Sequence, residues 1–147
     1  MNWNWVLLMA CFGIVMGLVN LTGWADGREW YLWIIIGLIT ALVLALKVRG
    51  KYFKHGFVTA IIAATVNTLL IYLFFDQYLA NSAKMQEAMK QVPEGFDMRN
   101  MMLISAPFTI AISGVVQGAL TLLMGKLLGE KAAPASPAAQ DEQLPPS

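Results

Sequence analysis

The chain has 147 residues, of which 58% are hydrophobic and 13% are charged, and its formal net charge is +1. An average soluble domain has about 25% charged residues, so this composition is unlike that of a soluble globular domain. The single cysteine, Cys11, excludes an intramolecular disulfide and a cysteine-based zinc cluster.

Four apolar runs follow one another along the chain, and each is close to the roughly 20 residues that span a bilayer. None contains Asp, Glu or Arg, and Lys126 lies near the end of the last run. The runs are apolar on all sides, whereas a helix of a soluble protein has a polar face. We predict an all-α membrane domain over residues 1–131, with helices at about 5–24, 30–48, 57–75 and 101–128.

The first run is expected to remain in the membrane rather than to act as a cleaved signal peptide. A signal peptide has a basic segment before its apolar run and a small-residue cleavage site after it. The residues "MNWNW" carry no Lys or Arg, and "NLTGWADG" has no A-x-A pattern.

The segment "KVRGKYFKHG" joins the second and third runs and is strongly basic. Short connections rich in Lys and Arg stay on the cytoplasmic side of a membrane, so we predict that this connection and both termini are cytoplasmic. A second interpretation adds contact with anionic lipid headgroups, because four clustered cations meet the lower limit for such contact. Nucleic acid is not an expected partner, because no recognition fold surrounds the cluster. The four cations are Lys47, Arg49, Lys51 and Lys54.

Small residues recur at four-residue spacing in every run, which places each set on one face of a helix. Membrane helices approach closely where such residues face each other. The pattern predicts a compact four-helix bundle, although the same faces are also able to join two copies of the chain. The predicted packing residues are Gly13, Gly17, Gly37, Ala41, Ala60, Ala64, Gly114 and Gly118.

A few polar residues interrupt the apolar runs. Asn67 lies in the middle of the third run, and Ser113, Gln117 and Thr121 form a stripe along the fourth. Amides in hydrocarbon need hydrogen-bond partners, so Asn67 and Gln117 are expected to bond to other helices. The alternative is that the stripe lines a path for a solute or for water.

The segment between the third and fourth runs is long, and its first part has no Gly or Pro. The third helix is therefore expected to continue to about residue 91, where "PEG" breaks it. Its methionines are of a type that binds Cu(I), but we expect them to form an apolar surface, so no metal or other cofactor is predicted. Residues 132–147 are rich in Pro and Ala and are expected to be a disordered cytoplasmic tail.

Three stretches carry a resemblance to a known family: "GFVTAI", "YLFFDQYLANSAKMQEAMKQ" and "MMLISAPFTIAISGVVQGALTLLMGKLLGEK". Over roughly residues 5 to 131, the chain resembles the family of unknown function numbered forty-one ninety-nine, which is found mostly in Bacteroidetes. The resemblance implies a small bacterial protein with four membrane helices. The connection before the fourth helix is shorter here than in the family, and the tail is individual. The family has no assigned activity, so no site residues are carried over.

The residues do not favour catalysis. His55 is the only histidine, Cys11 is the only cysteine, and no carboxylate lies in the apolar runs, so an acid–base pair or a metal set is not expected. Ion-coupled transporters have an ionisable residue in the membrane, and this chain has none that is central to a run. We predict a small multi-pass inner-membrane protein that acts by association with a second copy or another membrane protein, as an accessory subunit, assembly factor or envelope component. The alternative is a facilitator for a neutral solute.

Overall fold

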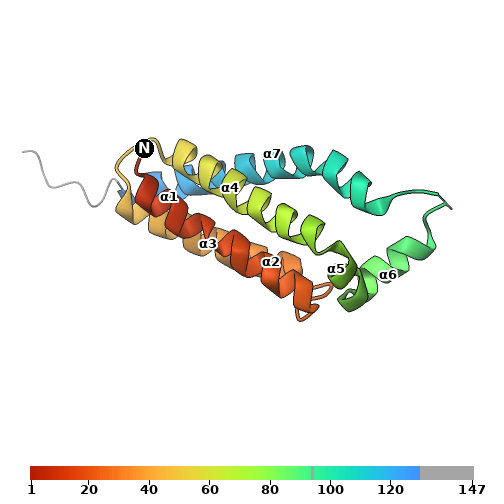
Figure 1. Ribbon diagram of the computed structural model, residues 1–147. Helices are drawn as coiled ribbons and strands as arrows, with labels where there is room; N and C mark the ends of the chain where they lie inside the picture. The colour runs from red at the N-terminus through yellow and green to blue at the C-terminus, as the bar shows by residue number, and fades with distance from the viewer. Residues whose placement is uncertain (94, 130–147) are drawn as a thin grey trace, which may run out of the picture.

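The computed structural model describes residues 1–93 and 95–129, and the regular structure in these ranges is entirely helical (Figure 1). The predicted all-α class is confirmed. The predicted disordered tail, residues 132–147, lies outside the described residues. The helices are α1 (Trp3–Ala10), α2 (Phe12–Thr22), α3 (Glu29–Lys47), α4 (Tyr52–Leu73), α5 (Phe75–Asn81), α6 (Ala83–Lys90), α7 (Met98–Met124) and a π-helical turn, η1 (Gly125–Gly129).

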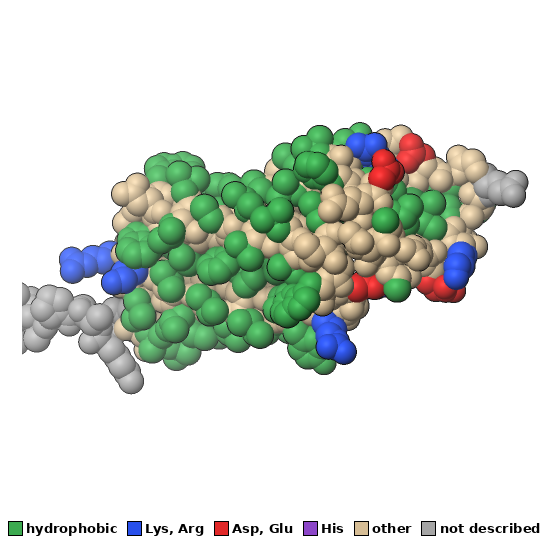
Figure 2. Space-filling view, turned by 60° about the horizontal axis from the view of Figure 1, so that its bottom comes forward, with side chains coloured by type: hydrophobic (Ala, Val, Ile, Leu, Met, Phe, Trp, Pro, Cys, Tyr) green, Lys and Arg blue, Asp and Glu red, His purple; other side chains and the backbone are tan. Residues whose placement is uncertain are grey.

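Four helical stretches are long and apolar enough to cross a membrane: Trp3–Thr22, Glu29–Lys47, Tyr52–Leu73 and Met98–Leu128. The first combines α1 and α2, which meet at Cys11. Cys11 itself has helical dihedral angles, with φ −58° and ψ −23°, so the chain keeps its direction there. Hydrophobic side chains cover the middle of the molecule, and charged side chains lie towards its two ends (Figure 2).

The two ends of the molecule differ in charge. The basic end comprises the N-terminus of α1, the α3–α4 connection and the C-terminus of α7, and no acidic residue of the described ranges lies there. The opposite end, called here the mixed-charge end, carries acidic and basic residues together. The cations of the basic end are Lys47, Arg49, Lys51, Lys54 and Lys126, and the described acids of the mixed-charge end are Asp26, Glu29, Asp76, Glu87 and Asp97.

Helix α4 is the centre of the packing, because α1, α2 and α7 all contact it extensively. Glycines allow this close approach: a Cβ at Gly13 would overlap the Ala63 carbonyl group of α4. A Cβ at Gly118 would lie 2.8 Å from the Phe53 ring, also on α4. Gly17 and Gly114 face α4 in the same way, so the glycine pair of α2 and the glycine pair of α7 both make contacts within the chain.

The segment after α4 differs from the single helix expected to reach about residue 91. α4 ends at Leu73, and the short helices α5 and α6 follow, separated at Ser82. Ser82 is extended, with φ −108° and ψ 105°, and its side chain accepts a hydrogen bond from the Met85 amide. Ser82 therefore ends one helix and caps the next, as serine commonly does at a helix N-terminus.

Candidate functional site

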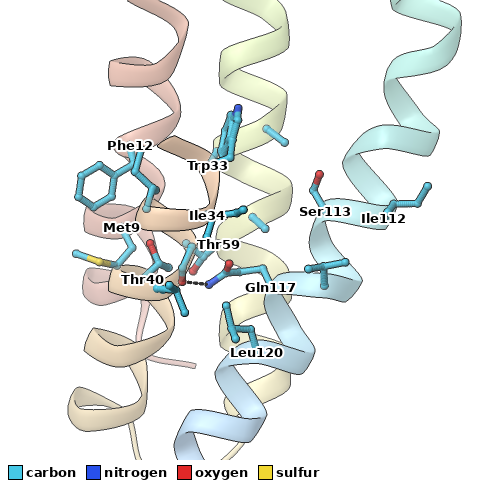
Figure 3. A pocket seen from close by; sticks show the side chains of 17 residues that line it. Met9, Phe12, Trp33, Ile34, Thr40, Thr59, Ile112, Ser113, Gln117 and Leu120 are labelled. Carbon is cyan, nitrogen blue, oxygen red and sulfur yellow. Dashed lines mark hydrogen bonds between the residues drawn. The ribbon is translucent and has the colours of Figure 1, made fainter. Parts of the chain in front are cut away.

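A cavity of about 440 Å³ lies between α3 and α7, with α4 as its floor (Figure 3). Beside it, the Gln117 side-chain amide donates a hydrogen bond to the Gly37 carbonyl oxygen, at 3.0 Å. Figure 3 shows α7 leaning away from α3 beyond this bond, towards the mixed-charge end. Gln117 thus ties the two helices together at one level, and the cavity occupies the space where they separate.

The walls of the cavity are mainly apolar. Ala60 and Ala64, which were expected to be packing contacts, line its floor, and Phe12 and Trp33 lie at its sides. Ala41 is fully buried in the core. The small side chains of α4 leave the space that larger residues would fill, so the cavity is a consequence of the same small-residue pattern that allows close packing elsewhere.

The polar stripe of α7 is divided between the cavity and the core. Ser113 and Gln117 line the cavity. Thr121 is fully buried and does not line it; its hydroxyl donates to the Gln117 carbonyl oxygen at 2.8 Å. A Cβ at Gly56 of α4 would collide with the Thr121 hydroxyl. The chain is therefore tightly packed between the cavity and the basic end.

A second polar contact joins α2 and α4. The Asn20 side-chain amide donates to Asn67 Oδ1, at 3.2 Å. Asn20 is buried, and its own Oδ1 has no hydrogen-bond partner within the described part of the chain. Asn67 thus bonds to another helix, and its partner is a residue of the same type.

The basic end is organised around His55, which is buried. His55 Nε2 accepts a hydrogen bond from the Asn2 amide at 3.0 Å, and Nδ1 lies 2.9 Å from the Lys51 carbonyl oxygen. Because a carbonyl oxygen only accepts, this arrangement assigns the proton to Nδ1 of a neutral imidazole. Lys51 has a left-handed backbone, with φ 51°. The side chains of the four predicted cations, Lys47, Arg49, Lys51 and Lys54, are exposed.

A hydrogen-bond network fixes the mixed-charge end. Asp26, in the turn between α2 and α3, accepts from the Ser82 hydroxyl at 2.7 Å and from the Lys84 amide at 3.2 Å. The Asn81 side-chain amide donates to the Leu21 carbonyl oxygen at 2.7 Å. The Ser82 hydrogen bond holds the pKa of the Asp26 carboxyl below its usual value. These bonds attach α5 and α6 to the turn that follows α2.

Helix α6 is ordered by this network, yet none of its residues is buried. Met85 and Met89 are half-buried, while Lys90 and Glu87 form an exposed ion pair at 3.0 Å. Beside the network, burial raises the pKa of the Tyr78 phenol above its usual value. In residues 1–93 and 95–129, no three His, Cys, Asp or Glu side chains form a group able to hold a metal ion.

The fold and the cavity define a class, namely a helical protein with four helices able to cross a membrane and a side cavity between two of them. Comparison with protein-family models, curated proteins and solved structures finds no significant match to this chain. The resemblance to the family of unknown function stays a prediction, and the function has to be argued from the chain's own residues.

Proposed function

We propose that the chain is a multi-pass protein of the bacterial inner membrane, with its basic end in the cytoplasm. The charge distribution supports this orientation: among the described residues, the acids all lie at the mixed-charge end, and only cations lie at the other. Cytoplasmic loops of membrane proteins carry such an excess of Lys and Arg. In this orientation both termini are cytoplasmic, and the exposed cations of the α3–α4 connection also contact anionic headgroups.

Replacement of Lys47, Arg49, Lys51 and Lys54 by Glu tests the orientation. We expect this fourfold variant to insert with inverted or mixed topology. The measurement is labelling of Arg28→Cys, in a Cys11→Ser background, by an impermeant maleimide on intact cells. The label should reach Arg28→Cys when the native loop is present and lose access in the fourfold variant. A Lys84→Glu, Lys90→Glu control should behave as the native chain, and unchanged labelling of the fourfold variant would refute the orientation.

The chain acts in this proposal by association with another membrane protein or with a second copy, as an accessory subunit, assembly factor or envelope component. The observation that carries it is α6, a helix held in place by Asp26 and Ser82 that buries none of its residues. An isolated helix of eight residues is unstable in water, so the network maintains a surface that the bundle itself does not use. Met85 and Met89 are covered only in part by the chain itself, and the exposed part of each side chain suits an adaptable apolar contact.

The alternative, a facilitator for a neutral solute, has less support. Such a path would have to continue from the cavity to the basic end, and Thr121 is packed against Gly56 there. Catalysis also has little support, because His55 is engaged with Asn2 and Lys51 and the described carboxylates lie at the far end from it. We therefore propose a protein that is neither a transporter nor an enzyme.

Photo-crosslinking in native membranes tests the association. A photoreactive residue replaces Met89 on α6, and a control replaces Ile14, which is exposed on the apolar surface of α2. We expect Met89 to form a discrete protein adduct, Ile14 to label lipid, and Asp26→Ala to weaken the Met89 adduct. If Met89 labels only lipid or its own chain, the association proposal fails, and flux through liposomes becomes the next measurement.

A further inference from the structure

We propose that the cavity between α3 and α7 binds a neutral lipid, namely an uncharged amphiphile with one apolar chain and a hydroxyl group. This inference depends on the membrane insertion proposed above, but it does not depend on a protein partner. It assigns the cavity a ligand of its own, beyond the association proposed for α6.

The mouth of the cavity indicates where its ligand comes from. Ile34 and Leu38 of α3 and Ile112 and Val116 of α7 line the cavity and are also 43% to 65% exposed. Four large apolar side chains thus flank the opening. In a membrane these residues face hydrocarbon rather than water. A ligand therefore enters sideways from the bilayer, which selects molecules that dissolve in lipid.

The lining also selects against charge. No Lys, Arg, Asp, Glu or His is among the described residues that line the cavity. The free-energy cost of transferring an unpaired charge into such surroundings far exceeds the stabilisation from contacts with an apolar wall. A charged headgroup is therefore excluded from the cavity, and an uncharged molecule is admitted.

Three polar groups in the cavity have unused hydrogen-bonding capacity. Thr40 is only 4% exposed and lines the cavity, yet its hydroxyl makes no hydrogen bond to another described residue. The Ser113 hydroxyl and Gln117 Oε1 also lie at the cavity and make no hydrogen bond to another described residue. The side-chain nitrogen of Gln117 already donates to the Gly37 carbonyl oxygen. In hydrocarbon, polar groups are satisfied by partners other than water. Because Gln117 Oε1 only accepts, its partner must donate, and a hydroxyl group meets this need without carrying a charge.

The size and shape of the cavity favour a lipid over a partner helix. A volume of about 440 Å³ falls in the range of small-molecule sites, roughly 300–1,000 Å³. A helix is about 10 Å across and needs a groove that continues along its neighbours. This cavity instead ends at the level of Leu120, one residue before the buried Thr121. A single chain with a small polar head fits such an enclosed end.

Photolabelling of the purified full-length protein in phosphatidylcholine vesicles tests the proposal. The probe is a monoacylglycerol with a diazirine in its acyl chain, and the labelled residues are identified by mass spectrometry. We expect labels on α3 and α7 around the cavity. Ser113→Leu fills the cavity and breaks no hydrogen bond of Ser113 in the described structure, so it should reduce this labelling about tenfold, the effect of roughly 1.4 kcal/mol. Ser105→Leu makes the same change on an exposed part of α7, outside the cavity, and should leave labelling unchanged.

A second probe, the matching fatty acid methyl ester, has no hydroxyl group and should label the cavity about threefold to tenfold less than the monoacylglycerol does. Thr40→Val keeps the shape of the side chain and removes one of the three polar groups, so it should reduce this difference. It replaces Ser113→Leu if that variant does not fold. Equal labelling by the two probes would show that the cavity accepts any acyl chain and would overturn the proposal. The proposal would also be overturned if Ser113→Leu did not reduce the labelling. It would be overturned as well if no labelling occurred and a second copy were crosslinked across Leu38→Cys and Val116→Cys.

Discussion

Helix α4 meets its neighbours in two different ways. Towards α2, Gly13 brings the two backbones together, and a side chain as small as a methyl group would overlap Ala63. Towards the gap between α3 and α7, the small residues Ala60 and Ala64 of α4 face a cavity instead. The same kind of residue thus gives close packing where a second helix reaches it and an open space where the neighbouring helices separate. A helix face of small residues allows another helix to approach closely. The positions of the other helices determine whether one does.

Gly13→Ala is expected to have the largest effect on this contrast. The new Cβ would meet the backbone of Ala63, which cannot rotate away, so α2 and α4 must separate. We expect a loss of about 3 kcal/mol in the free energy of unfolding, the upper end for overpacked sites, measured in mixed detergent micelles. Gly118→Ala meets the Phe53 ring, a side chain that is able to move, and should cost about 1 kcal/mol or less. Equal losses in the two variants would contradict the distinction between backbone and side-chain contact.

Asn67→Leu should destabilise the α2–α4 contact by about 1–2 kcal/mol, because it leaves the buried Asn20 amide without its partner. The free energy of unfolding measures this loss, and a double-mutant cycle with Asn20→Leu isolates the coupling between the two amides. If Asn67→Leu has no effect while Asn20→Leu does, the pair is not the source of the stability.

Gln117→Leu addresses the other side of the comparison. It removes the side-chain hydrogen bond from α7 to the Gly37 carbonyl oxygen, which is expected to contribute about 1 kcal/mol. We expect that α3 and α7 move apart in this variant and that assembly is disturbed. Any solute flux should remain unchanged. Spin labels at Leu38→Cys and Val116→Cys, in a Cys11→Ser background, measure the separation. Thr109→Leu, on an exposed part of α7, is the control and should leave it unchanged.

The smallest expected effect is a pH dependence at the mixed-charge end. The pKa of Asp26 is lowered from 3.8, chiefly by the Ser82 hydrogen bond. Its stabilising contribution is therefore complete above the pKa of the unfolded carboxyl and is lost as pH falls through the lower pKa of the folded state. Amide hydrogen exchange in α6 should accelerate, relative to α5, as the pH falls below about 4 and through the lowered pKa of Asp26. Asp26→Asn should abolish this pH dependence of exchange. If the exchange in α6 still accelerates at low pH in this variant, another acid is responsible.

The sequence predicted the all-helical class because runs of about 20 apolar residues have few alternatives. The polar residues of the candidate site were also visible, since Asn67 and Gln117 are conspicuous in apolar surroundings. The hydrogen-bond partners of these residues could not be predicted. Gln117 bonds to the Gly37 backbone carbonyl oxygen, a group that every residue has, so the pairing depends on which helices are neighbours.

The break at Ser82 has no Gly or Pro, the strongest helix breakers, to mark it in the sequence. A serine three residues before Met85 is a capping signal, but its strength here comes from Asp26, which is 56 residues away. The division of the Ser113, Gln117 and Thr121 stripe was equally hidden. Thr121 packs where Gly56 has no side chain, and no regular spacing in the sequence connects those two residues.

The central position of α4 has a consequence for synthesis. α1 and α2 pack mainly on α4, and α3 packs mainly on α7 and η1. The first two membrane spans to leave the ribosome meet in a small apolar cluster around Met9 and Leu44, but most of their native contacts are with spans that are made later. α1 and α2 gain their main neighbour only when the third span, α4, is inserted. α3 gains its main neighbour only when the fourth span, α7, is inserted. A chain interrupted after residue 48 would thus remain an unassembled hairpin, recognisable to the proteases that remove incomplete membrane proteins.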